Sequence, residues 1–356
     1  AKMAKQNVVI VLLALLGHIQ ADVDCTYSNV YPRQYVAYKL EPGTLDPTML
    51  DGDLTKSVWE EVPWSDDFVD ISTTTIPKFN TRTKIRWDDE FLYIGAQLQE
   101  TEVWATLTEH DSVIYYDNDF EIFVDGNATT HYYKEYEMNA FNTTWDLCLN
   151  QPYANNGYEN SSRVFGDQGF DMQPPLRCGV SIMPNTINDP SNKNEYWSVE
   201  VALPLNGLML NNTSTSPKHN SLWRINFSRV EWAVIVNETS GEYEKQPSCQ
   251  SCAEPGDAVE DNWVWSPMYA VAMHAPERWG VLQFSTDSPI TDSPTDPLYY
   301  NEWPARAAAM SIYNAEYLYY NDYGEFTSSY NKLLLLNYSS LPFELCPSLS
   351  LESEEH

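Results

Sequence analysis

Apolar and polar positions alternate with a period of two along much of the chain. Thr83, Ile85 and Trp87 alternate with two basic residues, and residues 92–98 repeat the pattern after the acidic residues 88–90. Two alternating runs on either side of a polar turn are typical of a β-hairpin with one buried face. The sequence therefore predicts strands at residues 83–87 and 92–98.

The same alternation predicts a strand at residues 119–125. Phe120, Ile122 and Val124 then share one face, and the opposite face carries Asp119, Glu121, Phe123 and Asp125. Further strands are expected at residues 133–140, 197–203, 223–230 and 280–284. Many short alternating strands and few helical periods favour an all-β fold, an immunoglobulin- or jelly-roll-like antiparallel β-sandwich.

Both ends of the chain differ from this central region. Lys2 and Lys5 precede the apolar residues 8–17, which predicts a signal peptide at residues 1–21. The sandwich is expected at residues 22–284 and a Ser-, Thr-, Asp- and Pro-rich linker at residues 285–303. Residues 304–356 are expected to form a helix over residues 304–320, ending before Gly324, and a tail that docks on the sandwich in a hairpin-like form, tethered by Cys346.

The cysteines and sequons fit a secreted protein. An even set of six cysteines predicts disulfides of undetermined pairing among Cys25, Cys148, Cys178, Cys249, Cys252 and Cys346. Candidate N-glycosylation sites are Asn127, Asn142, Asn160, Asn212, Asn226, Asn237 and Asn337. Secretion to the extracellular space is the expected localisation.

The net charge limits the partners. Fifty-one acidic residues against 20 basic ones give a formal charge of −31, which disfavours nucleic acids and anionic membranes. No apolar run outside the leader is long enough to insert in a membrane, and that of the leader is too short as well. Nothing in the sequence predicts an oligomeric state.

A series of motifs then suggests a family. Leu50-Asp51-Gly52-Asp53 comes first, and the series continues with Trp59 and the segments 83–87, 92–95, 104–108, 116–125, 136–140, 144–147, 223–232, 263–267 and 279–284. In this order the motifs resemble those of the family 9 carbohydrate-binding modules and their secreted relatives. The resemblance covers roughly two thirds of the chain, although no single motif is specific by itself.

The resemblance implies a sandwich that clamps an oligo- or polysaccharide between two aromatic rings. It places Glu121 as a hydroxyl acceptor, Tyr115 (where the family has tryptophan) and a ring near Trp265 as the clamp, and Glu137 and Asn139 as polar contacts. Positions at strand ends and in loops make further tryptophans candidates for stacking on a sugar. The candidate sugar-binding residues are Trp104, Tyr115, Glu121, Glu137, Asn139, Trp145, Trp263 and Trp265.

The sequence also bears on metal binding, catalysis and functions other than sugar binding. The resemblance and the hard oxygen ligands favour calcium at Asp117, Asp119 and Asp125, with Asn118 beside them. Asp119 and Glu121 lie on one strand, so they are poorly placed to attack a glycosidic bond from two sides, and we expect no enzyme activity. Alternative functions are an extracellular structural or adhesive glycoprotein, or a haem protein of the related DOMON group with Met and His ligands from Met138, Met273, His131 and His274.

Arg229 and Glu231 form either a site pair or, as the sequence favours slightly, a structural salt bridge.

Overall fold

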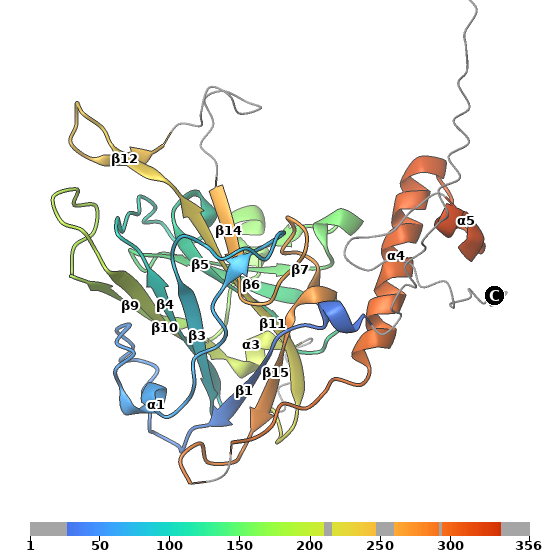
Figure 1. The fold of residues 1–356 in the computed structure, drawn as a ribbon, viewed down its shortest axis with the longest axis horizontal. Helices are drawn as coiled ribbons and strands as arrows, with labels where there is room; N and C mark the ends of the chain where they lie inside the picture. The colour runs from blue at the N-terminus through green and yellow to red at the C-terminus, as the bar shows by residue number, and fades with distance from the viewer. Residues whose placement is uncertain (1–26, 210–215, 247–259, 292–293, 336–356) are drawn as a thin grey trace, which may run out of the picture.

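β-Strands form the body of the molecule in the computed structural model, which describes residues 27–209, 216–246, 260–291 and 294–335 (Figure 1). Thirteen strands form one curled sheet, in the order β8-β7-β6-β5-β11-β15-β1-β3-β4-β10-β9, with β14 pairing both β11 and β2. A small hairpin of β12 and β13 is separate. The strands are β1 (Gln34–Lys39), β2 (Val69–Asp70), β3 (Thr81–Trp87), β4 (Phe91–Gln99), β5 (Asp119–Asp125), β6 (Tyr133–Asn139), β7 (Thr144–Leu149), β8 (Glu159–Asn160), β9 (Arg177–Met183), β10 (Tyr196–Pro204), β11 (Leu222–Trp232), β12 (Val234–Val236), β13 (Tyr243–Lys245), β14 (Glu260–Val264) and β15 (Gly280–Ser285).

Antiparallel pairing joins most neighbours in the sheet, so the predicted all-β fold class is confirmed. β1 is an exception to the antiparallel pairing, because it lies between β15 and β3 and runs parallel to both. β11 crosses the sheet and connects its parts: its first half pairs with β15 and its second half with β14, while β5 lies along its other edge. The strands that surround this junction carry the site described below.

The main core lies inside the curl of the sheet. Phe120, Ile122 and Val124 of β5 are fully buried there and belong to the same cluster as Ile94 and Leu98 of β4. These side chains occupy the faces that the alternation predicts. Burial of such side chains, at about 25 cal/mol per Å² of apolar surface, is the main force holding the two parts of the curl together.

The outer faces of the strands are also covered, which the sequence did not indicate. Tyr93 of β4 packs with Trp59 of α1 (Ser57–Glu60), and Phe123 of β5 packs with Trp279. The prediction of a hairpin with one buried face is therefore wrong for β3 and β4. Loops and short helices, rather than water, cover the second face.

The first motif of the series builds one of these covering layers. The buried carboxylate of Glu200 in β10 accepts hydrogen bonds from the backbone N–H of Gly52 (3.0 Å) and from Trp59 Nε1 (2.7 Å). Gly52 has φ +80°, and a Cβ atom there would lie 2.3 Å from the backbone nitrogen of Ser181. A glycine is required because both the backbone angle and the space exclude a side chain.

Short helices connect the strands, and one long helix follows them. The short ones are α2 (Ser162–Phe165), α3 (Leu205–Leu208), η1 (Ser28–Val30), η2 (Ile114–Tyr116), η3 (Tyr153–Asn155), η4 (Gly166–Gln168) and η6 (Pro276–Arg278). The long helix α4 (Trp303–Tyr323) stands at one side of the sheet, remote from α1 (Figure 1). The predicted helix is confirmed, and Gly324, at φ 74°, ends it by donating its N–H to the carbonyl of Tyr320.

The start of α4 docks on the body of the molecule, but the segment after α4 does not have the predicted hairpin-like form. Trp303 is fully buried and donates from Nε1 to the carbonyl of Glu277 (3.2 Å). A second helix, α5 (Tyr330–Leu335), packs its Leu333 against Tyr319 of α4, in place of a hairpin. Cys346 and the signal peptide lie outside the described residues. None of the described helices combines the length and apolar character that crossing a bilayer requires.

Candidate functional site

A cavity of about 540 Å³ opens on the outer face of β5, β6 and β7, opposite the main core. Four of the eight candidate sugar-binding residues line it, namely Tyr115, Glu121, Glu137 and Trp145. The alternation of each strand places Glu121, Glu137 and Trp145 outward, and η2 carries Tyr115. The loop before η6 closes one side of the cavity with Met273 and His274. The cavity has the size of a small-molecule site.

Three buried carboxylates lie beside one another at the floor of this region. Glu121 of β5 pairs directly across the strands with Glu137 of β6, and Asp119 is next to Glu121 on the same face. Their side chains are 5%, 2% and 0% exposed. One oxygen from each of them lies within 4.8 Å of the others. Three negative charges cannot share so small a buried volume without a proton or a cation.

Burial raises the pKa of all three carboxyl groups. The pKa of Glu121 rises to about 7, because burial removes its solvation and Glu260 adds a nearby negative charge. Burial and the charge of Glu121 raise the pKa of Asp119 and of Glu137 well above the ordinary range. Burial and the charge of Glu121 also raise the pKa of Glu135, which lies two positions before Glu137 on β6. Burial beside other carboxyl groups therefore favours protonated or cation-paired forms over several free negative charges at the floor of the cavity.

Aromatic rings form a second wall. Tyr115 of η2 and Trp145 of β7 have ring centroids 6.4 Å apart at an interplanar angle of 34°, a distance at which the two rings interact with each other directly. The Arg163 guanidinium covers the Trp145 ring at 5.1 Å and also pairs with Glu159. Tyr153 of η3 adds a ring that is 44% exposed. The geometry offers one aromatic wall, in place of the two-ring clamp that the resemblance implies.

The other four candidate residues do not line the cavity. Trp265 is 0% exposed and packs on Phe227 and against the backbone of Gly280, where a Cβ atom would lie 2.2 Å from its ring. Trp263 is also in the main core. Placing the second clamp ring near Trp265 is therefore wrong for this structure, because a fully buried ring cannot stack on a sugar.

Asn139 and Trp104 have structural partners of their own. The Asn139 amide donates to the carbonyl of Leu107 and to Asp117, and its oxygen accepts the backbone N–H groups of Phe141 and Thr143. No polar atom of Asn139 is left to bind a hydroxyl group. Trp104 is 6% exposed and forms, with two other rings, an aromatic box around the ammonium group of Lys245 on β13. The other rings of this box are Tyr116 and Trp232.

The predicted calcium ligands are not brought together. Asp117 accepts the backbone N–H groups of Thr106 and Leu107, both at 2.8 Å, and Asp125 accepts those of Thr129 and Thr130 at the other end of β5. Their oxygens are used by the protein itself. Asp119 differs, because its Oδ2 is buried and has no hydrogen-bond partner among the described residues. A hard cation therefore fits the set of Asp119, Glu121 and Glu137 and does not fit the predicted set.

Only part of the disulfide and glycosylation predictions falls on described residues. Cys148 and Cys178 are free thiols in the structure, so neither shows the predicted bond, and Cys25, Cys249, Cys252 and Cys346 lie outside the described residues.

Asn226 is 0% exposed and donates its amide to the carbonyl of Ser266, so its prediction as a glycan site is wrong. Asn127 and Asn142 are exposed, and Asn160 and Asn237 are half-buried. Asn212 and Asn337 lie outside the described residues.

The remaining predictions concern haem and the Arg229 pair. Met138 lies in the main core and His131 beside Tyr313 of α4, whereas the neighbouring Met273 and His274 both line the cavity from a loop. The four candidate haem ligands therefore do not converge.

Arg229 is 0% exposed and pairs with Glu100 and Glu231 at 2.8 Å each, which makes it a structural residue of the core.

Several cavity residues were missed by the sequence reasoning. Glu135 had a detectable signal, because it shares the outward face of β6 with Glu137. Tyr153, Glu159, Arg163 and His274 come from loops and edge segments, where the alternation that identifies strand faces gives no information. His274 is neutral at physiological pH, because burial lowers its pKa to about 4.

Comparisons with known proteins identify the family. The family model described as "Carbohydrate family 9 binding domain-like" matches residues 50–282, about two thirds of the chain. No curated protein matches the sequence.

Among solved structures, a protein of Bacteroides uniformis that is provisionally described as carbohydrate-binding is similar, with 13% identity, coverage of 71% of this chain and 100% of that one, and a TM-score of 0.47. A family 9 carbohydrate-binding module of Caldicellulosiruptor kristjanssonii is similar in its complexes with cellotriose (16% identity, 74% and 100% coverage, TM-score 0.40) and with glucose (15%, 74% and 100%, 0.40). These scores are below 0.5, so the assignment rests on the family model. By that match, the chain belongs to the carbohydrate family 9 binding domain-like proteins.

Proposed function

We propose that this protein is a secreted, non-catalytic carbohydrate-binding protein that holds a neutral or basic saccharide in the cavity of Glu121 and Glu137. The supporting observation is the combination of an aromatic wall and a row of carboxyl groups in one cavity of about 540 Å³. Rings cover the apolar C–H faces of a sugar, and carboxyl groups accept hydrogen bonds from hydroxyl or ammonium groups. The family membership and the apolar residues 8–17 after two lysines support the same function and its location.

The arrangement of the carboxyl groups supports binding rather than hydrolysis. Glycosidases place an acid and a nucleophile or base on two sides of the bond that is cleaved, about 5–10 Å apart. Asp119, Glu121 and Glu137 instead come from two adjacent strands and have oxygens within 4.8 Å of one another on a single wall. Such a row can address one side of a ligand only. The same row would hold a calcium ion, should the protein bind one, through the orphaned Oδ2 of Asp119.

The binding function is tested with a glycan array, followed by calorimetry on the saccharides that bind. Tyr115→Ala should weaken binding by about 1–3 kcal/mol, because it removes a ring from the aromatic wall. Tyr132→Ala is the matched control, since Tyr132 is 52% exposed and does not line the cavity. Equal affinities of the parent and Tyr115→Ala for every bound glycan would show that sugars bind elsewhere.

The non-catalytic part of the proposal needs its own assay. Release of reducing sugars from a panel of polysaccharides is measured with the parent and with Glu121→Gln, which keeps the shape of the side chain. We expect no turnover by either protein. Turnover by the parent that disappears in Glu121→Gln would establish an enzyme and contradict the proposal.

A further inference from the structure

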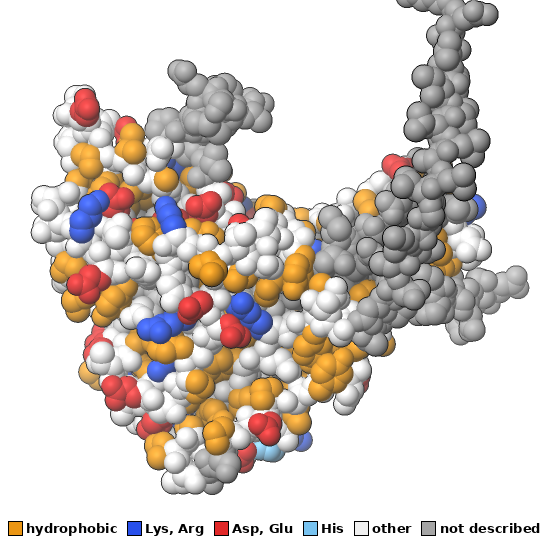
Figure 2. Space-filling model, viewed as in Figure 1, with side chains coloured by type: hydrophobic (Ala, Val, Ile, Leu, Met, Phe, Trp, Pro, Cys, Tyr) orange, Lys and Arg blue, Asp and Glu red, His pale blue; other side chains and the backbone are white. Residues whose placement is uncertain are grey.

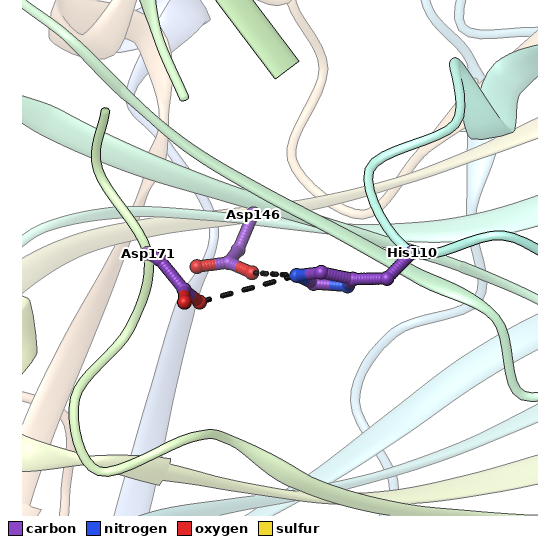
Figure 3. Close-up of side chains that lie close together, drawn as sticks. All are labelled: His110, Asp146 and Asp171. Atoms are coloured by element: carbon purple, nitrogen blue, oxygen red, sulfur yellow. Dashed lines mark ion pairs between the residues drawn. The ribbon is translucent and has the colours of Figure 1, made fainter. Parts of the chain in front are cut away.

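A second cluster of polar side chains lies outside the sugar site, around His110 (Figure 3). The ring nitrogen Nε2 of His110 faces Asp146 Oδ1 at 3.6 Å and Asp171 Oδ1 at 3.9 Å. A third carboxylate oxygen, Oδ1 of Asp111, lies at 3.5 Å from the same nitrogen. The three segments that carry these residues are the loop before η2, strand β7 and the segment before β9. The cluster joins parts of the chain that are far apart in sequence.

The other nitrogen of His110 fixes the orientation of the ring. Nδ1 lies 2.9 Å from the backbone carbonyl of Thr144. A carbonyl oxygen only accepts hydrogen bonds, so Nδ1 is the donor, and Nε2 is the nitrogen that faces the carboxylates and could coordinate a metal ion. Metal-binding histidines have this arrangement, with one nitrogen donating to a backbone carbonyl and the other free for the metal.

A backbone hydrogen bond also fixes the orientation of the Asp146 carboxylate. Its side chain is 2% exposed, and its Oδ2 accepts the backbone N–H of Met172 at 2.7 Å. Among the described residues no hydrogen bond reaches its Oδ1, the oxygen that faces His110. The hydrogen bond to Oδ2 thus holds the carboxylate in place and leaves Oδ1 available to a metal ion.

The distances favour a metal ion over a direct salt bridge. An imidazolium N–H would draw one carboxylate oxygen to about 2.7–2.9 Å, whereas all three oxygens stay 3.5–3.9 Å from Nε2. Two ligand atoms that are each about 2.0–2.2 Å from a tetrahedral ion are about 3.3–3.6 Å apart. The observed spacing is close to that between ligands around one ion.

We propose that His110, Asp146 and Asp171 form a binding site for a divalent transition-metal ion such as Zn²⁺. An imidazole nitrogen among carboxylates favours zinc and its neighbours over calcium or magnesium. His110 and Asp171 are 50% and 45% exposed, so the ion has access from solvent. Bound metal would tie the loop before η2 to β7, and η2 and β7 carry Tyr115 and Trp145 of the sugar site. The proposal does not depend on the sugar-binding function.

The test is calorimetric titration of the full chain with zinc chloride at neutral pH, after treatment with a chelator and its removal. We expect one bound zinc ion per chain and a dissociation constant raised at least about tenfold in both His110→Ala and Asp171→Asn. Both residues are about half-exposed, so the variants should fold, which circular dichroism checks. Asp167→Asn is the matched control, because it removes an exposed carboxylate of the neighbouring η4 that does not face His110. Its affinity for zinc should equal that of the parent.

Three results of the zinc titrations would overturn the proposal, and a fourth comes from a titration with Co²⁺. The first is no zinc binding by the parent, and the second is binding that both variants leave unchanged. The third is zinc binding lost in Glu137→Gln but kept in Asp171→Asn, which would place the ion in the sugar cavity. Titration with Co²⁺ adds a spectroscopic check, since a thiolate charge-transfer band would indicate ligation by cysteines and would also contradict the site.

Discussion

Single residues decide what the cavity can bind, and the environment of Glu121 changes its ordinary chemistry. Its carboxyl group lies in a strand, opposite Glu137, with almost no contact with water. The sequence placed it on the outward face of β5, and by itself this position would suggest a solvated charge. The structure shows instead that loops and short helices bury this face, so the same alternation leads to a buried acid.

The raised pKa of Glu121 makes a prediction about stability. The group titrates near 4.5 when unfolded and at about 7 when folded. Between these values the folded chain holds a proton that the unfolded chain has released, so this contribution to the free energy of unfolding falls as the pH rises through the window. Glu121→Gln cannot ionise and should therefore be more stable than the parent above pH 7, by about 3 kcal/mol, and equal to it below pH 4.5.

Urea unfolding of the parent and of Glu121→Gln at pH 4.5 and pH 8, in the presence of a calcium chelator, measures this difference. Glu325→Gln, a change at an exposed carboxylate on the far side of α4, serves as the control and should show no such dependence. A gap between parent and Glu121→Gln that is the same at both pH values would mean that Glu121 is not desolvated.

At the scale of elements, the sequence predicted strands well and their surroundings less well. The period of two identified β4, β5 and β6 and the side chains that share each face, because alternation is a local property of a strand. It could not show whether the second face is covered, since that depends on loops from distant parts of the chain. Trp265 illustrates the limit: its position after a strand suggested a loop, but the missing side chain of Gly280 makes room for it in the core.

The residues of the candidate sites likewise divide into those that local sequence patterns can identify and those that only the fold brings together. Glu121 and Glu137 could be named in advance because a family resemblance and strand alternation both apply to them, whereas Tyr115 followed from the resemblance alone and Trp145 from its predicted place at a strand end or in a loop. The cluster of His110, Asp146 and Asp171 could not, since its members are separated by 36 and 25 positions and follow no motif spacing. Convergence of that kind is set by the path of the chain through the whole sheet.

The helix α4 allows a prediction about an element as a unit. Trp303 at its start is fully buried with Tyr27 and Tyr31, at ring-centroid distances of 6.4 and 5.2 Å. Trp303→Ala leaves a large cavity, at a cost of about 3–5 kcal/mol in packing, and should release α4 from the sheet. Hydrogen exchange at residues 303–323 should then rise while exchange in β4 and β10 is unchanged.

Leu318→Ala provides the comparison, because Leu318 lies in the same helix but is 43% exposed. Its exchange rates should match those of the parent. Faster exchange throughout the sheet in Trp303→Ala would show instead that α4 and the sandwich unfold together as one unit.

For the molecule as a whole, the net charge of −31 and the charges inside the cavity make separable contributions to ligand choice. On the face shown in Figure 2, acidic and basic side chains lie interspersed, with no continuous region of one sign. The cavity differs, because its lining includes Glu121, Glu135 and Glu137 against the single, already paired Arg163. Overall charge acts through solvent and is screened within about 3 Å at 1 M salt, whereas buried groups are screened much less.

A ligand series therefore tells the two contributions apart. Neutral, amino-bearing and uronic-acid oligosaccharides of equal length are titrated at 0.15 M and 1 M salt, with the parent and with Glu137→Gln. We expect the order amino, neutral, uronic acid for the parent, because an ammonium group replaces the protons that the carboxyl row otherwise holds. If the cavity sets this order, 1 M salt should weaken the preference for the amino sugar only in part, and Glu137→Gln should reduce it at both salt concentrations. A preference that disappears in 1 M salt and is untouched by Glu137→Gln would arise from the surface charge alone, and the carboxyl row would then have no part in selecting the ligand.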